Sequence, residues 1–280
     1  WHQYMSDFGL GHPMGVDIPH ENGGHIPDSA YFNRVYAGNW NSCNMSIIGM
    51  GQGEVELTPM QLANSMCIIA NRGKYFIPHF VKSIDGDSTH PMLQKYLQPK
   101  VVAKINDSSF EYVIAGMQAV VDQGTGKIAK IPNVTVCGKT GTVQNERMVM
   151  GRKVKLQNHS MFVAFAPRHQ PKIAVAVCIE NSGYGATWAG PIASLMIEQY
   201  LNDTISKKRQ FLVKRMQDAK IIPNYTYILD SIDKQMAKDK LAMKNMSKDS
   251  SRRIQKIKDS LQYRSDSIRA NFLLQKMYGY

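Results

Sequence analysis

Long apolar runs are missing from this chain of 280 residues. A helix needs about 18 or more consecutive apolar residues to cross a bilayer, and no segment meets that requirement. Cysteine is also scarce, and the four thiols show no Cys-x-x-Cys spacing and no accompanying histidine cluster. The sequence therefore predicts no membrane-spanning helix, no metal site and no cofactor. The thiols are typical of free, buried side chains, although an oxidising compartment would permit disulfides whose pairing stays open. They are Cys43, Cys67, Cys137 and Cys178.

An initiating methionine is absent as well, because the chain starts at Trp1. We therefore expect a fragment of a longer protein. The lack of a signal peptide then excludes no compartment, and any membrane anchor would lie outside this sequence.

Acidic residues are in short supply only toward the end of the chain. Residues 203–280 contain 18 Lys and Arg against 8 Asp and Glu, a net charge of +10, whereas residues 1–202 contain 16 against 14, a net charge of +2. We therefore predict a nearly neutral globular domain in residues 1–202 and a basic extension in residues 203–280. Helical spacing of its apolar residues predicts one or two charged helices. These residues are Ile254, Ile257, Leu261, Ile268, Phe272 and Met277. Such a tail can bind nucleic acid, anionic lipid or an anionic polymer, and a solvated helical extension is the simpler interpretation.

Capping signals predict the helices of the globular domain. Thr58-Pro59-Met60-Gln61 has the pattern of a capping box with proline at the first helical position, and Gly73 ends the apolar periodicity that follows. Ser108-Ser109-Phe110-Glu111 is a second capping box, which begins a helix through Val121 that stops at Gly124-Thr125-Gly126. Residues 1–10 are predicted to be the end of a helix, and residues 188–201 a closing helix.

β-Branched and alternating runs predict strands at residues 75–84, 134–137, 159–165 and 172–179, with residues 167–171 as a turn. Residues 20–41 are rich in Gly, Pro and Asn, which predicts a long loop. Residues 45–53 are predicted to form a glycine-rich turn, which lacks the Lys-Ser/Thr end of a phosphate-binding P-loop. Together these patterns indicate an α+β domain, an antiparallel sheet with helices packed on its faces.

The candidate site is the segment Gly138-Lys139-Thr140-Gly141-Thr142, which follows the strand signal at residues 134–137. On a strand, Lys139 and Gly141 share one face and Thr140 and Thr142 the other. Gly141 has no side chain to obstruct a ligand that approaches the backbone. A Lys-Thr-Gly on a strand is similar to one of the three signatures of penicillin-recognising serine enzymes. Taken alone, the tripeptide also fits a solvated strand end.

Further blocks extend this resemblance, in order, over residues 8–201. They are Gly51-Gln52-Gly53, residues 57–64 and 70–73, the run from Gly138 to Gln144, and residues 159–167 and 172–177. With these blocks the chain resembles the class B penicillin-binding proteins, and among them the elongation-type peptidoglycan D,D-transpeptidases. The resemblance implies the C-terminal part of a transpeptidase domain, with the fold shared with serine β-lactamases and incomplete at its N-terminal side.

The resemblance also assigns catalytic and substrate-binding roles. Lys139 would add positive potential and orient hydroxyl groups, and Thr140 and Thr142 would bind the terminal carboxylate of a D-Ala-D-Ala stem peptide or of a β-lactam. Gly141 would leave room for the substrate, which would pair with the strand edge. The Thr142 N–H would be one of two oxyanion donors.

The serine nucleophile of the family, in a Ser-x-x-Lys motif, is expected upstream of Trp1, together with the Ser-x-Asn relay. Ser231-Ile232-Asp233-Lys234 has the spacing of the first motif but follows the strand motif in the chain, where it should precede it. Ser42-Cys43-Asn44 spells the second but lies inside the block that leads to Gly51. Neither is interpreted as catalytic, because each lacks the structural context of its motif.

Partners and location follow from the same resemblance: stem peptides, β-lactam antibiotics and wall-elongation membrane proteins, no nucleic acid, and the periplasmic face of a bacterial inner membrane. Two alternatives stay open. A β-lactamase or penicillin-sensing domain of the same fold usually lacks the blocks around Gln52 and at residues 57–64. A non-catalytic wall-elongation partner would have a decayed site, against which the intact run from Gly138 to Gln144 argues.

Overall fold

The computed structural model describes residues 1–102, 105–149 and 152–221, and the single positions Lys234, Ala237, Lys238, Asp259 and Gln262. The apolar positions that predicted helices in the basic extension, from Ile254 to Met277, lie outside the described residues. One compact unit contains Trp1–Asn145 and Leu156–Ala219, and the hairpin at Glu146–Lys155 falls in a second unit. The candidate site lies wholly in the first unit.

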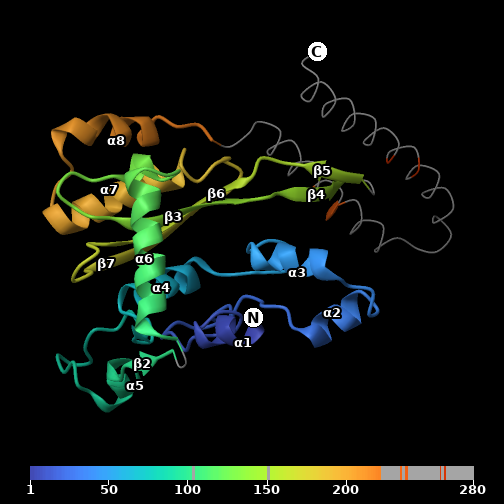
Figure 1. Cartoon of the computed structure of the whole chain (residues 1–280), viewed down its shortest axis with the longest axis horizontal. Helices are drawn as coiled ribbons and strands as arrows, with labels where there is room; N and C mark the ends of the chain where they lie inside the picture. Colours follow the sequence, from blue (N-terminus) through green and yellow to red (C-terminus); the bar gives the residue numbers. More distant parts are fainter. Residues whose placement is uncertain are drawn as a thin grey trace. The chain divides into compact units, whose positions relative to one another are not determined.

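A three-stranded antiparallel sheet forms the centre of the first unit (Figure 1). Its strands are β3 (Cys137–Val143), β6 (His159–Ala166) and β7 (Ile173–Ile179), in the order β3-β6-β7. β6 is central: Phe162 and Ala164 are buried on one of its faces and Phe165 on the other. The strands predicted at residues 159–165 and 172–179 are confirmed. The strand predicted at residues 134–137 is wrong apart from Cys137, because Val134 pairs with Ile131 in an isolated bridge and the Thr135 carbonyl accepts from the Arg168 N–H outside the β3–β6 ladder.

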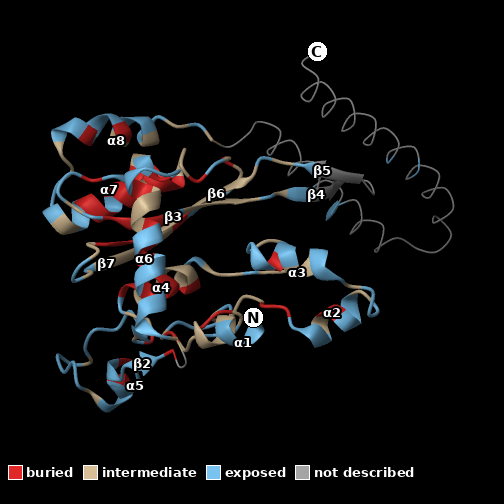
Figure 2. Cartoon of the chain, in the orientation of Figure 1, coloured by how far each residue is buried: buried red, intermediate tan, exposed pale blue. Residues whose placement is uncertain are grey.

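Helices cover both faces of this sheet. α7 (Ala189–Asn202) packs on one face, where Ala193 and Ile197 join the buried side chain of Phe162. α4 (Pro59–Ala70) and α6 (Asp107–Asp122) pack on the opposite face, where they enclose Cys137 and Phe165. Figure 2 shows buried residues gathered in α7, in α4 and along the strands. The predicted α+β domain, an antiparallel sheet with flanking helices, is confirmed.

The N-terminal caps of α4 and α6 can be compared with the capping residues that the sequence predicts. Thr58 and Gln61 form the predicted capping box of α4: the Gln61 N–H donates to Thr58 Oγ1 at 3.2 Å, and the Thr58 N–H donates to Gln61 Oε1 at 3.0 Å. α6 begins earlier than predicted, because Asn106 rather than Ser108 is the cap. The Ser108 N–H donates to Asn106 Oδ1 at 3.1 Å. The first usable side-chain acceptor before the helix therefore sets its start.

Two segments predicted as loop or turn contain helices. Residues 20–41 include α2 (Ser29–Val35), whose cap Asp28 accepts from the Tyr31 N–H at 2.7 Å. The turn predicted at residues 45–53 is wrong for its first five residues, which belong to α3 (Ser42–Gly49), a helix that Asn41 and Asn44 begin as a capping box. Local glycine and asparagine content suggested loop in both cases, but the same asparagine and aspartate side chains cap the helices.

The strand predicted at residues 75–84 is also wrong beyond its first residue. β1 (Lys74–Tyr75) pairs with β2 (Lys100–Val101), and the extended pairing stops there. Pro78 lacks an N–H for a ladder. The N–H groups of Phe80 and Val81 donate instead to the Asp17 carboxylate, at 2.8 Å each for the shortest pairs.

Gln61 ties the loop after α1 (His2–Asp7) to the sheet-packing helix α4. Its side chain is 1% exposed, and Nε2 lies 2.7 Å from the Gly23 carbonyl oxygen and 3.1 Å from that of His12. A Cβ at Gly24 would stand 2.8 Å from Gln61 Oε1, so only glycine fits beside this amide. One buried side chain therefore satisfies backbone groups that the loop itself leaves without partners.

Residues 203–219 pack back on α7. The 3₁₀ turn Lys207–Arg209 places Arg209 Nη1 2.6 Å from Glu198 Oε2 and Arg209 Nη2 2.6 Å from Ser194 Oγ. In α8 (Gln210–Gln217), Leu212 is 2% exposed. The first compact unit thus continues to Ala219. The sequence predicts a domain boundary earlier, directly after Asn202, and that boundary stays a prediction.

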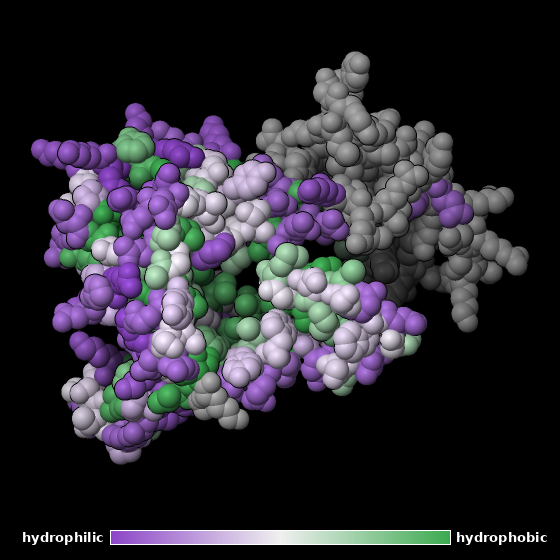
Figure 3. Space-filling model, in the orientation of Figure 1, coloured by the Kyte–Doolittle hydropathy of each residue, from purple (hydrophilic) through white to green (hydrophobic). Residues whose placement is uncertain are grey.

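The remaining described elements are short. They are the helix α5 (Gln94–Leu97), the 3₁₀ turns Pro91–Leu93 and Lys127–Ala129, and the hairpin of β4 (Glu146–Val149) with β5 (Arg152–Lys155). Within the described ranges, no helix combines the length and the hydrophobicity that a membrane crossing requires. Hydrophilic side chains cover much of the visible face of the described chain (Figure 3).

Candidate functional site

The predicted site residues Lys139, Thr140, Gly141 and Thr142 all lie on β3, an edge strand of its sheet. One side of β3 pairs with β6, and the other side is the open edge (Figure 1). The N–H and C=O of one residue point to the same side of a strand, and the side alternates along the chain. Lys139 Nζ and the Gln52 side chain reach the carbonyls of Thr140 and Thr142, so the backbone groups of these two residues face the open edge.

Lys139 and Thr140 lie on opposite faces of the strand, as the sequence predicts. Thr140 stands opposite Phe162, which belongs to the core on the α7 face. Lys139 stands opposite Val163, which packs on the α4 and α6 side. The Lys139 side chain is exposed, and its Nζ donates to the Thr140 carbonyl oxygen at 2.7 Å. A cation is thereby held at the open edge.

Thr125 joins the site, although its sequence context predicts only the end of a helix. Its Oγ1 lies 2.8 Å from Thr140 Oγ1, and either hydroxyl can donate. Gly124 and Gly126 flank Thr125, and a Cβ at either position would stand within 3.1 Å of Val120. The two glycines let the loop fold tightly on the last turn of α6 and present the hydroxyl to β3. A threonine between two glycines directly after a helix is the signal that could have found it.

Gln52 is the second residue that the sequence analysis did not assign to the site. Its Nε2 donates to the Thr142 carbonyl oxygen at 3.0 Å, and its Oε1 accepts from the Gln144 N–H at 3.4 Å. Gly51 and Gly53 on either side have φ angles of 75° and 67°, which side chains rarely tolerate. The Gly-Gln-Gly motif therefore presents one carboxamide at the tip of a tight turn.

The loop that follows β7 lies against the site from the α7 face. A Cβ at Gly185 would stand 2.5 Å from the Gly141 carbonyl oxygen, and closer still to that of Met161. Ser160 Oγ fixes this loop, since it donates to the Tyr184 carbonyl at 2.9 Å and accepts from the Ala189 N–H at 3.1 Å. The backbone at Gly141 is therefore supported by a glycine from another part of the chain.

Cys137 is the nucleophilic side chain that lies next to the site in the chain, at the start of β3. Its thiol is fully buried, and desolvation raises its pKa to about 11, although the nearby Arg168 acts in the opposite direction. A thiol with this pKa is almost entirely protonated at neutral pH, which makes it a poor nucleophile. In the described part of the chain, no three His, Cys, Asp or Glu side chains form a group that could hold a metal ion.

The two motif lookalikes fall in different places. Asn44 of Ser42-Cys43-Asn44 is engaged in the cap of α3, where its Oδ1 accepts from the Asn41 N–H at 3.0 Å. Ser231 lies outside the described residues, and Lys234 is described only as an exposed position.

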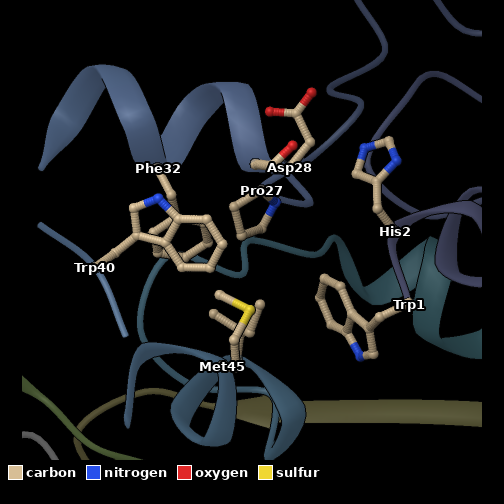
Figure 4. Close-up of a pocket in the computed structure, with 9 residues that line it drawn as sticks. Trp1, His2, Pro27, Asp28, Phe32, Trp40 and Met45 are labelled. Carbon is tan, nitrogen blue, oxygen red and sulfur yellow. The ribbon is translucent and has the colours of Figure 1, made fainter. Parts of the chain in front are cut away.

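A cavity of about 310 Å³ lies elsewhere in the same unit, and no β3 residue lines it (Figure 4). Its wall is mainly aromatic and aliphatic, and the rings of Phe32 and Trp40 lie 5.6 Å apart. The lining residues are Trp1, His2, Pro27, Asp28, Ser29, Phe32, Trp40, Met45 and Ile48. The cavity contains none of the predicted site residues.

An antiparallel sheet enclosed by helices, with Lys-Thr-Gly on its edge strand, is the arrangement that the resemblance predicts for a penicillin-recognising transpeptidase. Residues 1–198 match the family described as penicillin binding protein transpeptidase domain, and the chain belongs to that family.

Relatives of established name agree with this assignment. The peptidoglycan D,D-transpeptidase MrdA of Haemophilus influenzae is 34% identical over 227 residues, which cover 76% of this chain and 34% of that protein. The MrdA protein of Escherichia coli K12 is 28% identical over 215 residues, 71% of this chain and 32% of the relative. The chain thus spans about a third of the length of these relatives.

Solved structures show the same fold. The chain is similar to Pseudomonas aeruginosa PBP2 in complex with WCK 5153, with a TM-score of 0.61 and 29% identity over 74% of this chain and 44% of that one. It is similar in fold to PBP2 in the complex with MreC from Helicobacter pylori, with a TM-score of 0.57 and 24% identity over 71% of this chain and 35% of that one.

Proposed function

We propose that the protein is a peptidoglycan D,D-transpeptidase that cross-links stem peptides during wall elongation, with β3 as the strand along which the substrate binds. The observation that carries the proposal is the open edge of β3, where the Lys139 ammonium, the Thr140 hydroxyl and the backbone of Thr142 stand together. Membership of the transpeptidase family and similarity to the MrdA proteins support it.

Thr140 and Thr142 bind the substrate carboxylate in this proposal. When Thr125 Oγ1 donates to Thr140 Oγ1, the Thr140 proton is free to donate to a carboxylate oxygen. The exposed ammonium of Lys139 adds positive potential at the same edge. Hydrogen bonds to a charged acceptor are the stronger kind, so this pair of hydroxyls and one cation suits the terminal carboxylate of D-Ala-D-Ala or of a penicillin.

The Thr142 N–H points to the open edge and is the proposed oxyanion donor from this chain. A serine oxygen from the part of the protein upstream of Trp1 attacks the carbonyl carbon of the penultimate D-alanine, and the developing oxyanion accepts from this N–H. One such donor contributes roughly 3–4 kcal/mol in acyl transfer. The peptide bond then breaks, and D-alanine leaves with a proton on its nitrogen. The amine of a neighbouring stem peptide attacks the ester, releases the serine and forms the cross-link.

Location and partners complete the proposal. A transpeptidase of the wall works on the periplasmic face of the inner membrane, held there by an anchor outside this sequence. The relative from Helicobacter pylori was solved in complex with MreC. We therefore propose a wall-elongation membrane protein of that kind as a partner, and no nucleic acid.

Labelling of the whole protein with a fluorescent penicillin tests this function. We expect a stable covalent adduct, and we expect Lys139→Ala to slow its formation by about 10²-fold or more, because the group acts on charge in the reaction. Lys172→Ala is the matched control, since Lys172 is also exposed but lies directly before β7, and it should label at the wild-type rate.

Four outcomes would contradict parts of the proposal. Rapid hydrolysis of the penicillin without a lasting adduct would identify a β-lactamase. Absence of any reaction in the wild-type protein would favour a non-catalytic wall-elongation partner. If Lys139→Ala loses labelling only to the extent that its lower melting temperature leaves less folded protein, the role of Lys139 is structural. Residues 1–280 alone should not label, and an adduct on them would direct attention to Ser231.

A further inference from the structure

Gln52 makes two hydrogen bonds at the C-terminal end of β3, one to Thr142 and one to Gln144 directly beyond the strand, and both ends of its carboxamide take part. Nε2 donates to the Thr142 carbonyl at 3.0 Å, and Oε1 accepts from the Gln144 N–H at 3.4 Å. A residue on an added parallel strand would bond to the same two groups, which belong to residues i and i+2 of the edge. The carboxamide thus occupies the position that the next strand would take.

This contact is built by the tertiary structure and not by local sequence. Gln52 and Thr142 are 90 positions apart in the chain. The turn that carries Gln52 folds tightly against α3, because a Cβ at Gly53 would stand 2.9 Å from the Ile47 side chain. Gln52 itself is half-buried, so the position of its carboxamide is restricted on both sides.

The Thr142 carbonyl that Gln52 binds belongs to the same residue as the proposed oxyanion donor, the Thr142 N–H. Since the Thr142 C=O and N–H lie on the same side of the strand, a bond that holds the C=O in the sheet plane also limits rotation of the N–H beside it. The Thr142 carbonyl oxygen keeps a second lone pair, so the bond from Gln52 restrains the strand without closing it to a bound extended peptide.

We propose that Gln52 is a positioning residue for the transpeptidase reaction, because its carboxamide fixes the Thr142 backbone for oxyanion stabilisation. This inference rests on the proposed function of β3. Gln52 does not touch the reacting atoms, and it acts through the backbone of Thr142.

The test uses Gln52→Met and Gln52→Glu in the whole protein. Methionine has a similar volume and removes both hydrogen bonds. Glutamate keeps the acceptor for the Gln144 N–H but sets a carboxylate oxygen against the Thr142 carbonyl, so the loss should be at least as large. Gln98→Met is the matched control, because Gln98 is exposed and lies at the end of α5.

Penicillin acylation is measured as a function of concentration, which separates the acylation rate constant from the half-saturating concentration. We expect Gln52→Met to lower the rate constant about tenfold or more, with a change of less than about threefold in half-saturation and of less than about 2 °C in melting temperature. Gln98→Met should match the wild type in all three. A wild-type rate constant in Gln52→Met, or a loss that follows the melting temperature, overturns the proposal.

Hydrogen–deuterium exchange keeps this inference separate from the proposed function. A peptide that covers residues 138–144 should exchange faster in Gln52→Met than in the wild type or in Gln98→Met, because the edge loses its cover. If the wild-type protein fails to react with penicillin, the proposed function falls, and the exchange result still decides whether Gln52 holds the strand. Unchanged exchange would refute that part directly.

Discussion

Replacing Arg209 by methionine takes the cation away from Glu198, a carboxylate that is 1% exposed. Arg209 is itself 6% exposed, and its guanidinium bonds to Glu198 Oε2 and to Ser194 Oγ, each at 2.6 Å. After the substitution the Ser206 N–H, at 3.2 Å, is the hydrogen-bond donor that Glu198 retains. A buried charge would then lack a counter-charge inside the core next to α7.

The magnitude follows from this burial. Removal of one partner of a buried ion pair costs about 3–5 kcal/mol, whereas an exposed pair is worth about 0–1 kcal/mol. In a domain of this size each kcal/mol lowers the melting temperature by about 2–4 °C, so Arg209→Met should lower it by about 6–20 °C. Lys208→Met, at the exposed neighbouring position, should change it by less than about 2 °C.

Differential scanning calorimetry of the whole protein measures these shifts. The double variant Glu198→Met/Arg209→Met removes both charges and should recover most of the lost melting temperature, because apolar replacements of a buried pair are often close to neutral. Equal melting of Arg209→Met and Lys208→Met would show that the pair does not hold the fold. A double variant no more stable than the single one would show that the loss comes from packing and not from an isolated charge.

The Glu198–Arg209 ion pair predicts how far the chain can be truncated from its C-terminal end. Truncation after Ala219 keeps Arg209 and the buried Leu212, and we expect it to leave melting and penicillin labelling of the whole protein nearly unchanged. Truncation after Asn202 removes both and leaves Glu198 without its cation, so we expect early melting. If both truncations behave like the wild type, the domain boundary predicted after Asn202 holds and residues 203–219 are dispensable.

Three further predictions follow from single side chains. Burial raises the pKa of the Cys137 thiol to about 11, so N-ethylmaleimide at pH 8 should modify the exposed Cys43 long before Cys137, as read by mass spectrometry. Equal modification rates would refute this expectation. Because the unfolded thiol ionises first, near the ordinary thiol pKa of 9.0, Cys137 should also make the fold less stable as pH rises from 9 to about 11, and a free energy of unfolding that stays constant over that range would refute this second expectation. Gln61→Leu should lower the free energy of unfolding in urea by about 2–4 kcal/mol, since it leaves the His12 and Gly23 carbonyls without their donor. A loss below about 0.5 kcal/mol would show that the Gln61 amide does not hold this loop. Thr125→Val should slow penicillin acylation several-fold, by about 1 kcal/mol, whereas Thr125→Ser should not; a wild-type rate in the valine variant would show that Thr140 needs no partner.

Local patterns predicted the parts of the fold in which a residue depends on close neighbours. The capping box at Thr58 was predictable because its two hydrogen bonds join residues three apart. The strands β6 and β7 were predictable because their apolar runs face cores on both sides. The strand expected after Tyr75 failed because Asp17, far back in the chain, takes the N–H groups of Phe80 and Val81.

Local sequence was enough to predict the family motif, the sheet-and-helix architecture and the placement of Lys139, Thr140, Gly141 and Thr142 on one strand, since strand geometry orders consecutive residues without reference to the rest of the chain. Which residues contact that strand depends on how the chain folds. In the described sheet β3 is an edge strand, because β6 pairs with one side of it and no strand pairs with the other. Thr125 contacts Thr140 from 15 positions away in the chain, and Gln52 contacts Thr142 from 90 positions away. A hydrogen bond of about 3 Å between distant residues depends on how every intervening element packs, and no local pattern records that distance.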